Sequence, residues 1–294
     1  MHIPVLLKEV IEYLDLRNGD IIVDATFGDG GHSREILKKI LPRGKIIAID
    51  FDQKAIEKGK ILFKEFEKNI IFVRANFKEI ENILAKLKIK KVNGILADLG
   101  FSSSQIENPE YGFAFLKESK LDARLSSDFK ISAKEVINQF SQRELEVIFR
   151  KYGEERFSRR IAEEIIRARS KKEIETTTEL GEIVKKAIPR KFWPKKIHPA
   201  TRVFQALRIY VNQELENLEE FLQKAPLFLR ENGKLIIISY HSGEDRLVKN
   251  YFKKFAQTGN FEILTKKPIR PSQEEINHNP RSRSAKMRVL KNKK

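Results

Sequence analysis

The chain has 294 residues, 40% of them hydrophobic and 34% charged, which is enough apolar material for one large domain or two ordinary ones. It contains no cysteine, and this excludes disulfides, thiolate metal sites and cysteine nucleophiles. No apolar run reaches the roughly 18 residues that a membrane helix needs, and the N-terminus lacks the features of a signal peptide. We therefore expect a cytoplasmic protein with no membrane partner.

The formal charge of +17 is concentrated in two segments. Residues 150–210 carry 17 Lys and Arg against 8 Asp and Glu, residues 264–294 carry 10 against 2, and the rest of the chain is balanced. Two basic segments on a neutral body favour contact with a polyanion. Solvated helix faces and a loose basic tail would give the same composition, and this alternative stays open.

The first hundred residues alternate between short apolar runs and helical patterns. The runs are rich in Ile and Val and end near Gly, Asn or Asp, as buried strands do. Strands are expected at 21–26, 45–50, 70–75 and 94–98, with helices at 33–40 and 53–66. Such β-α-β alternation predicts a parallel, doubly wound sheet.

The pattern then becomes helical, and no convincing strand lies between 128 and 198. Helices are expected at 133–140, 142–151, 155–169 and 178–187, with N-caps at Ser132, Ser141 and Thr177. A long amphipathic helix is expected at 200–222, and strands return at 234–240, 261–266 and 285–290. The predicted fold is α/β: residues 1–127 and 199–294 form a Rossmann-like seven-stranded sheet domain, interrupted by a helical insertion at 128–198.

A glycine-rich turn follows the first predicted strand, with Gly28, Gly30 and Gly31 just before a helix. A strand, a glycine turn and a helix start form the nucleotide-binding arrangement of doubly wound folds. Asp50 ends the second strand about twenty residues further on, which suits hydrogen bonds to ribose hydroxyls. A plain βα-turn without a ligand is the alternative interpretation.

The negative charge expected at the sheet edge favours S-adenosylmethionine over a dinucleotide cofactor. Aspartates fall at or just past the carboxyl ends of the predicted strands, where ligands bind in this fold; they are Asp24, Asp29, Asp50, Asp52 and Asp98. They would repel a pyrophosphate, and Ser33 occupies the third glycine position of the dinucleotide motif, so a nicotinamide oxidoreductase is disfavoured. S-adenosylmethionine carries a sulfonium and an ammonium and no phosphate. Asp29 and Asp52 have a second interpretation, as helix N-caps.

Asp98 ends the fourth predicted strand, at the edge that faces the transferable methyl group in methyltransferases of this fold class. Cytosine C5 methylation normally uses a cysteine, which this chain lacks, so direct attack by a substrate nitrogen or oxygen is expected. An exocyclic amine becomes nucleophilic when a carboxylate, hydroxyl or carbonyl accepts its N–H bonds, and no metal is required. The candidate catalytic residues are Asp98, His241 and Ser102.

Short strings along the whole chain resemble the bacterial small-subunit ribosomal RNA cytosine-N4 methyltransferase family, also called methyltransferase H or MraW. They are HIPVLL (2–7), TFGDGGHSR (26–34), AID (48–50), DLGFSSSQ (98–105), YGFAF (111–115), LDAR (121–124), YGEERF (152–157), HPATR (198–202) with FQA (204–206), SYHS (239–242) with EDR (244–246), and NPR (279–281). The chain departs from the family pattern at Ser104, Ala123, Ser126 and Gly243. These differences concern the conformation of loops and not the expected methyl transfer.

The resemblance implies a class I methyltransferase fold and methylation of a cytidine N4 in the decoding region of small-subunit ribosomal RNA. S-adenosylmethionine would be the cofactor, and the RNA or the 30S particle the partner. Position by position, the implied cofactor contacts are Gly30, Gly31, His32, Asp50, Phe77, Asp98 and Gln105. The oligomeric state is left open between monomer and homodimer. A non-catalytic ribosome-assembly factor is a rival; a DNA amino-methyltransferase is disfavoured because the Asp/Asn-Pro-Pro-Tyr signature is absent.

Several residues carry two interpretations each. His32 either caps a helix or contacts the cofactor, and His241 either contacts the target base or is structural. Asp122 and Arg124 form either an RNA clamp or a salt bridge, and Trp193 either stacks on RNA or packs on a helix. If the basic C-terminal segment contacts RNA, the expected contacts are Arg281, Arg283, Lys286 and Arg288.

Overall fold

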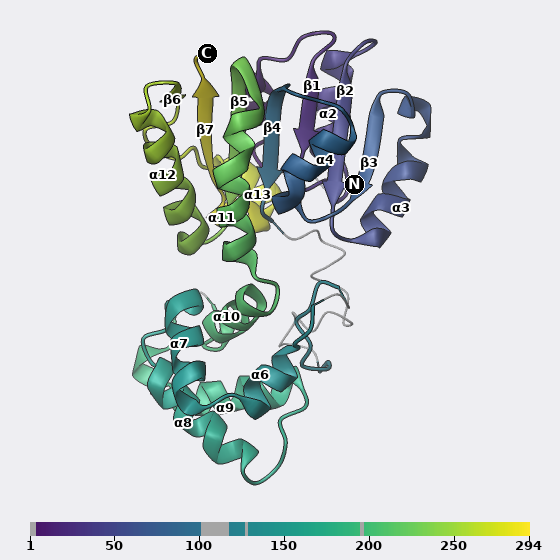
Figure 1. Cartoon of the computed structure of the whole chain (residues 1–294). Coiled ribbons are helices and arrows are strands. Elements are labelled where there is room, and N and C mark those ends of the chain that lie inside the picture. The colour runs from purple at the N-terminus through teal and green to yellow at the C-terminus, as the bar shows by residue number, and fades with distance from the viewer. Residues whose placement is uncertain (1–3, 101–117, 127–128, 195–196) are drawn as a thin grey trace. The chain divides into compact units, whose positions relative to one another are not determined.

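The structure is a computed structural model that describes residues 4–100, 118–126, 129–194 and 197–294 (Figure 1). The chain divides into two compact units. One contains Met1–Phe101 and Leu215–Lys294, and the other contains Ser102–Glu214. The first unit is therefore built from two separate stretches of chain, and it holds the sheet.

Seven strands form one sheet in the order β3-β2-β1-β4-β5-β7-β6. They span Ile21–Asp24 (β1), Lys45–Asp50 (β2), Ile70–Arg74 (β3), Val92–Asp98 (β4), Leu229–Ser239 (β5), Phe261–Ile263 (β6) and Lys286–Asn292 (β7). The parallel pairing expected for the first four strands is confirmed, and β5 continues it. β7 runs antiparallel to both β5 and β6. All seven strands lie where the sequence predicted them, although β5 begins five residues early because Leu229 already pairs with Val92.

Helices cover both faces of the sheet, because alternate residues of each strand point to opposite faces (Figure 1). In β2, Ile47 and Ile49 pack with residues of α4 (Ile80–Lys86), α11 (Glu214–Lys224) and α12 (Ser242–Gln257), whereas Ile46 and Ala48 pack with residues of α1 (Leu7–Leu14) and α2 (Gly31–Ile40). All four of these side chains are fully buried, which explains the uninterrupted apolar run of β2. The helices of this unit are α1 (Leu7–Leu14), α2 (Gly31–Ile40), α3 (Gln53–Leu62), α4 (Ile80–Lys86), α11 (Glu214–Lys224), α12 (Ser242–Gln257) and α13 (Gln273–His278).

The carboxyl ends of the parallel strands meet at one edge of the sheet. Asp24, Asp50 and Asp98 are the last residues of β1, β2 and β4, so three carboxylates share this edge. We call it the carboxyl edge. In doubly wound sheets ligands bind outside this edge.

The chain between β6 and β7 also lies at the carboxyl edge. Ser239, the last residue of β5, pairs with Lys286, the first residue of β7, so the segment that precedes β7 approaches from this side. Ile269 forms a bridge with Met287 and keeps the segment there. The basic C-terminal segment is therefore folded, which excludes a loose tail.

Arg288 and Lys286 of β7 are not free to contact RNA as expected. The Arg288 side chain is buried, and its Nε donates to Asp245 Oδ1 over 2.7 Å. Lys286 Nζ lies 3.3 Å from Asp245 Oδ2. The RNA-contact prediction is wrong for Arg288, because a central strand places its side chain in the protein interior.

In the described residues of the second unit the regular elements are helices, apart from an isolated antiparallel bridge between Lys120 and Thr176. Its helices are α6 (Ala133–Gln139), α7 (Gln142–Gly153), α8 (Ser158–Arg169), α9 (Thr177–Ala187) and α10 (Thr201–Val211). Capping boxes begin α6 at Ser132 and α7 at Ser141, as expected. The cap of α9 is Thr176 and not Thr177, because Thr176 accepts from Glu179 N. A short 3-10 turn of this unit spans Arg190–Phe192, and those of the first unit span Lys64–Phe66, Phe77–Glu79, Ala225–Phe228 and Pro280–Ser284.

The prediction of one long helix at 200–222 is wrong, since the helix is interrupted between α10 and α11. Gln213 has a left-handed φ of 52° at the break. The Asn212 side chain stabilises it by donating to Ala123 O over 2.8 Å and accepting from Leu125 N over 2.8 Å. The units divide at 101/102 and 214/215, whereas the expected boundaries were 127/128 and 198/199, so α10 lies in the helical unit.

None of the helices in the described part of the chain has the length and apolar character of a membrane span; the longest of them, α12, has 16 residues.

Candidate functional site

The glycine turn between β1 and α2 brings bare backbone to the carboxyl edge. Gly28 and Gly30 have φ values of +53° and +73°, a region that favours glycine. A Cβ on Gly30 would lie 2.6 Å from Phe27 Cζ, so the turn packs tightly against that ring. Gly30 is the N-cap of α2, and no side chain caps the helix. Its first N–H groups can therefore donate to a ligand.

Asp50 supports this turn with one carboxylate oxygen and the start of α3 with the other. Gly28 N donates to Oδ2 over 2.7 Å, and Asp52 N donates to Oδ1 over 2.8 Å. Burial nevertheless raises the pKa of Asp50 to about 6. Asp50 is therefore placed to accept further hydrogen bonds from a ligand beside the turn, and its charged form would gain from them.

Asp24 is a second buried carboxylate at the same edge. Its Oδ2 accepts from Ser33 Oγ over 2.6 Å, and its Oδ1 accepts from Thr26 N over 3.3 Å. Burial raises its pKa. Within the described ranges, neither Asp24 nor Asp50 forms an ion pair with Lys or Arg. The edge thus concentrates negative charge, which favours a cationic ligand over a pyrophosphate.

Asp98 lies beside His32 at the end of β4. Asp98 N donates to Thr26 Oγ1 over 2.7 Å, and Gly100 N donates to Asp98 Oδ1 over 3.3 Å. His32 Nδ1 lies 4.0 Å from Asp98 Oδ2. The side chain of Asp98 is 20% exposed against 8% for His32, so the carboxylate is the accessible member of the pair.

His32 does not cap α2, since Gly30 holds the cap position. Its Nε2 lies 3.0 Å from Val5 O, and because a carbonyl only accepts, Nε2 carries the proton. In the neutral ring Nδ1 is then an acceptor that faces another acceptor on Asp98. This arrangement favours a donor-bearing ligand between the two acceptors, such as an ammonium group.

Phe77 follows β3 and begins a 3-10 turn that Asn76 caps. Its ring is half-buried and packs edge-on against Phe221, with ring centroids 5.2 Å apart. The predicted cofactor residues Gly30, Gly31, His32, Asp50 and Asp98 thus surround the carboxyl ends of β1, β2 and β4, and Phe77 follows the adjacent strand β3. Ser102, Ser103 and Gln105 lie outside the described residues.

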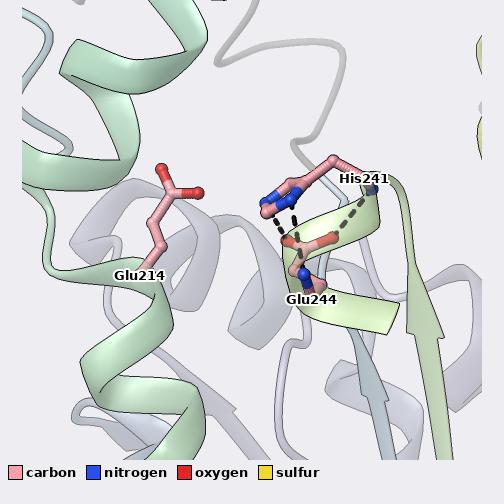
Figure 2. A group of neighbouring side chains, drawn as sticks. All are labelled: Glu214, His241 and Glu244. Carbon is pink, nitrogen blue, oxygen red and sulfur yellow. Dashed lines mark hydrogen bonds and ion pairs between the residues drawn. The ribbon is translucent and has the colours of Figure 1, made fainter. Parts of the chain in front are cut away.

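His241 has a structural role as the N-cap of α12 (Figure 2). Its Nδ1 accepts from Glu244 N over 3.3 Å, and its Nε2 lies 3.2 Å from Glu244 Oε1. Glu244 closes the capping box, because its Oε2 accepts from His241 N. Figure 2 also draws Glu214, the last residue of the helical unit, whose carboxylate accepts a bidentate pair of hydrogen bonds from Arg208.

Salt bridges and packing contacts define the roles of several charged and aromatic side chains. Arg124 donates to both oxygens of Asp122, over 2.7 and 3.0 Å, which is a salt bridge within the helical unit. Trp193 Nε1 donates to Ile188 O over 2.9 Å, so its ring packs at the end of α9. Asp52 caps α3, as expected from its position, whereas Asp29 pairs with Lys58 over 2.6 Å instead of capping a helix.

Sequence reasoning missed Tyr240, whose ring lies against the α-carbon of Gly100, the residue whose N–H donates to Asp98. The available signal was its position directly after β5, the strand next to β4.

The sheet order, the glycine turn after β1 and the carboxylates ending β1, β2 and β4 define a class I methyltransferase fold. A solved structure from Clostridium thermocellum, named as an rRNA-methylase, has the same overall fold: the match covers 99% of this chain and 100% of that one, with a TM-score of 0.50 and 12% identity. The chain belongs to the MraW methylase family, whose model matches residues 1–293.

Relatives of known sequence agree with this membership. A protein from Sulfurihydrogenibium sp. (strain YO3AOP1) is 49% identical over 288 residues, and one from Caldicellulosiruptor bescii is 47% identical over 304 residues. Each match covers 98% of this chain and 98% of the relative. Both relatives carry the name ribosomal RNA small subunit methyltransferase H.

Proposed function

We propose that this protein transfers a methyl group from S-adenosylmethionine to the exocyclic N4 amine of a cytidine in the decoding region of small-subunit ribosomal RNA. The observation that carries the proposal is the row of carboxylates beside a bare helix N-terminus, in a chain of the MraW methylase family. The names of the relatives support a small-subunit RNA substrate. The N4 atom and the decoding region rest on the family resemblance of the sequence.

The residues at the carboxyl edge fit the proposed cofactor. Asp50 would accept hydrogen bonds from ribose hydroxyls, and the amides of Gly30 and Gly31 would donate to the cofactor carboxylate. Asp98 and His32 present the acceptors that an ammonium group needs. Phe77 offers an aromatic face after β3, where adenine would lie, and Gln105 completes the proposed set outside the described residues.

The bound cofactor supplies an electrophilic methyl group on a positively charged sulfur. Asp98 would accept an N–H bond of the cytosine amine and hold its nitrogen toward that methyl group. Asp98 would accept the proton that the amine gives up on methylation, because its carboxylate stands at the end of β4 on the carboxyl edge. Orientation and preorganised charge would supply most of the acceleration. Ser102, which lies outside the described residues, is a further proposed contact of the target base. His241 would contact the base while it also caps α12.

The partner would be the ribosomal RNA or the 30S particle, so the reaction would belong to the bacterial cytoplasm. The proposed recognition element is the helical segment 128–198, which with its surroundings carries one of the two basic segments. The second basic segment would contribute Lys266, Lys267, Arg270 and Arg283, which are exposed at the carboxyl edge.

Turnover with labelled S-adenosylmethionine on small-subunit particles that lack the modification tests this function. The expected product is a methylated cytidine in the decoding region, located by mass mapping and identified as N4 by comparison with standards. Methyl groups at carbon 5 or on the ribose would contradict the proposed atom. Cofactor binding without any transfer would favour the non-catalytic assembly factor, and a melting temperature raised by a nicotinamide cofactor alone would favour an oxidoreductase.

A further inference from the structure

The segment at residues 4–6 lies on the glycine turn at the carboxyl edge. A Cβ on Gly31 would come within 2.5 Å of Pro4 Cγ, so Pro4 packs directly on the start of α2. One residue further along, Val5 O accepts from His32 Nε2 over 3.0 Å. These two contacts place the segment against Gly31 and His32, which are both proposed cofactor residues.

A carboxylate from the far end of the chain holds the same segment. Glu275 Oε1, on α13, accepts from Leu6 N over 2.8 Å. The Val5 carbonyl and the Leu6 N–H belong to one planar peptide group, so the acceptor of His32 and the donor to Glu275 can only turn together. A hydrogen bond to a carboxylate is stronger than one between neutral groups. Glu275 therefore fixes the direction in which the Val5 carbonyl points.

The position of Glu275 in α13 normally serves the helix itself. Glu275 is the third residue of α13, and its N–H donates to Ser272 Oγ over 3.1 Å. At the same position of α6, α7, α9 and α12 a glutamate turns back to the N-cap and closes a capping box. In α13 the Glu275 carboxylate instead reaches Leu6, 269 positions away in the chain. A residue type with a local role at four helix starts thus has a tertiary role at this one.

The Val5 carbonyl determines how the His32 ring faces the carboxyl edge. The last torsion of a histidine side chain is broad, and either ring nitrogen can carry the proton. The hydrogen bond to Val5 O places the proton on Nε2 and limits rotation of the ring. Nδ1 is then an acceptor in a fixed place, 4.0 Å from Asp98 Oδ2. A contact that is oriented before the ligand arrives needs no rearrangement on binding.

We propose that Glu275 is a positioning residue that acts through the peptide group of Val5 and Leu6 and holds the His32 ring in the tautomer and orientation that the cofactor requires. This inference rests on the proposed function, because it assigns His32 Nδ1 to the ammonium group of S-adenosylmethionine. Glu275 contributes through this peptide and not by contact with the cofactor. Its loss should therefore weaken cofactor binding even when the protein remains folded.

Calorimetry without RNA compares the affinities of the wild type and three variants for S-adenosylmethionine. Glu274→Ala is the matched control, because Glu274 is an exposed glutamate one residue earlier on α13. Glu275→Ala should bind the cofactor about tenfold more weakly than this control, the scale of a lost hydrogen bond to a charged group. Glu275→Gln should recover most of the loss, because its amide oxygen can accept from Leu6 N. Equal affinities in Glu275→Ala and Glu274→Ala overturn the inference.

Nitrogen NMR of the His32 ring separates positioning from a general loss of stability. The chemical shifts of the two ring nitrogens show which one carries the proton, and His32→Ala identifies the signals. At alkaline pH, wild type and Glu275→Gln should carry the proton on Nε2, whereas Glu275→Ala should show a mixture of tautomers. A lower melting temperature with unchanged tautomer and affinity would mean a purely structural role and would contradict the inference. Glu275→Asp, whose shorter side chain withdraws the carboxylate from Leu6 N, replaces Glu275→Ala if that variant does not fold.

A double-mutant cycle tests the path through His32. If Glu275 acts through that ring, Glu275→Ala should cost little further cofactor affinity in a protein that already carries His32→Ala. Additive losses would show that Glu275 acts by another route and would refute the proposed path.

Failure of this inference is distinguishable from failure of the proposed function. Wild-type protein that binds the cofactor but methylates another atom would refute the N4 assignment, and the binding comparison at Glu275 would still stand. Wild-type protein that methylates the expected cytidine, with Glu275→Ala equal to the control, would refute only the inference.

Discussion

Asp50 should couple cofactor binding to proton release. Its pKa lies near 6 in the unliganded protein because burial outweighs the two backbone donors from Gly28 and Asp52. Ribose hydroxyls that donate to the carboxylate would stabilise its charged form, so the complex should hold Asp50 ionised at pH values where the free protein is partly protonated. Binding near pH 6 then expels the proton from the protonated fraction.

The magnitude follows from that pKa. At pH 6 about half of the free molecules carry the proton, so binding should release about 0.5 proton per cofactor from this group. Affinity should fall by about tenfold between pH 7 and pH 5, because near pH 5 almost every molecule must first lose the proton. Above pH 7 the dependence on this group should vanish.

Titration calorimetry in buffers of different ionisation enthalpy measures the released protons directly. Asp50→Asn should remove about 0.5 proton from the value at pH 6, which separates this carboxylate from Asp24. Asp20→Asn is the control, since Asp20 precedes β1 at the opposite edge of the sheet. Identical proton release in wild type and Asp50→Asn would refute the assignment of Asp50 to the ribose.

Three further predictions concern the carboxyl edge and its surroundings. Asp98→Asn should lower the single-turnover rate by roughly two orders of magnitude and also weaken cofactor binding; a normal rate at saturation would leave Asp98 with cofactor binding alone. His241→Ala should destabilise the protein by about 1 kcal/mol in chemical denaturation, because α12 loses its N-cap, and His241→Asn should restore that stability. A methylation rate that is low in His241→Ala and stays low in His241→Asn would indicate that His241 contacts the base. A methylation rate restored in His241→Asn would show that His241 acts only as the cap. Replacing Lys266, Lys267, Arg270 and Arg283 by Gln should weaken RNA binding and reduce its salt slope by up to about 3, with cofactor affinity unchanged; an unchanged slope would remove this segment from the interface.

The strands were the most predictable part of the fold. β2 matches its predicted range residue by residue, because Ile46, Ile47, Ala48 and Ile49 are buried on both faces and Asp50 ends the run. The pattern of parallel strands also predicts that their terminal aspartates share an edge, and this is how Asp50 and Asp98 were found.

The errors arose where distant contacts decide the local structure. The apolar helical period continues through the break at Asn212, and the contacts that stabilise the break come from Ala123 and Leu125, far away in the chain. At α9 two adjacent threonines suit the cap, and only the hydrogen bond to Glu179 N distinguishes Thr176. The prediction that Arg288 contacts RNA was based on the charge of its segment alone. Its position inside a predicted strand was the available signal for a buried ion pair, which it forms with Asp245.

The separation of β4 from β5 along the chain has a consequence for synthesis. These neighbouring strands are joined through the whole helical unit, with about 130 residues between Asp98 and Leu229. A ribosome that adds roughly 5–20 residues per second needs on the order of 6–26 s to make that stretch. Throughout this interval apolar β4 can pair with β1 on one side only, and its other edge offers backbone hydrogen bonds to any passing strand. A chaperone that shields this edge during translation would therefore protect the growing chain more than one that acts after release.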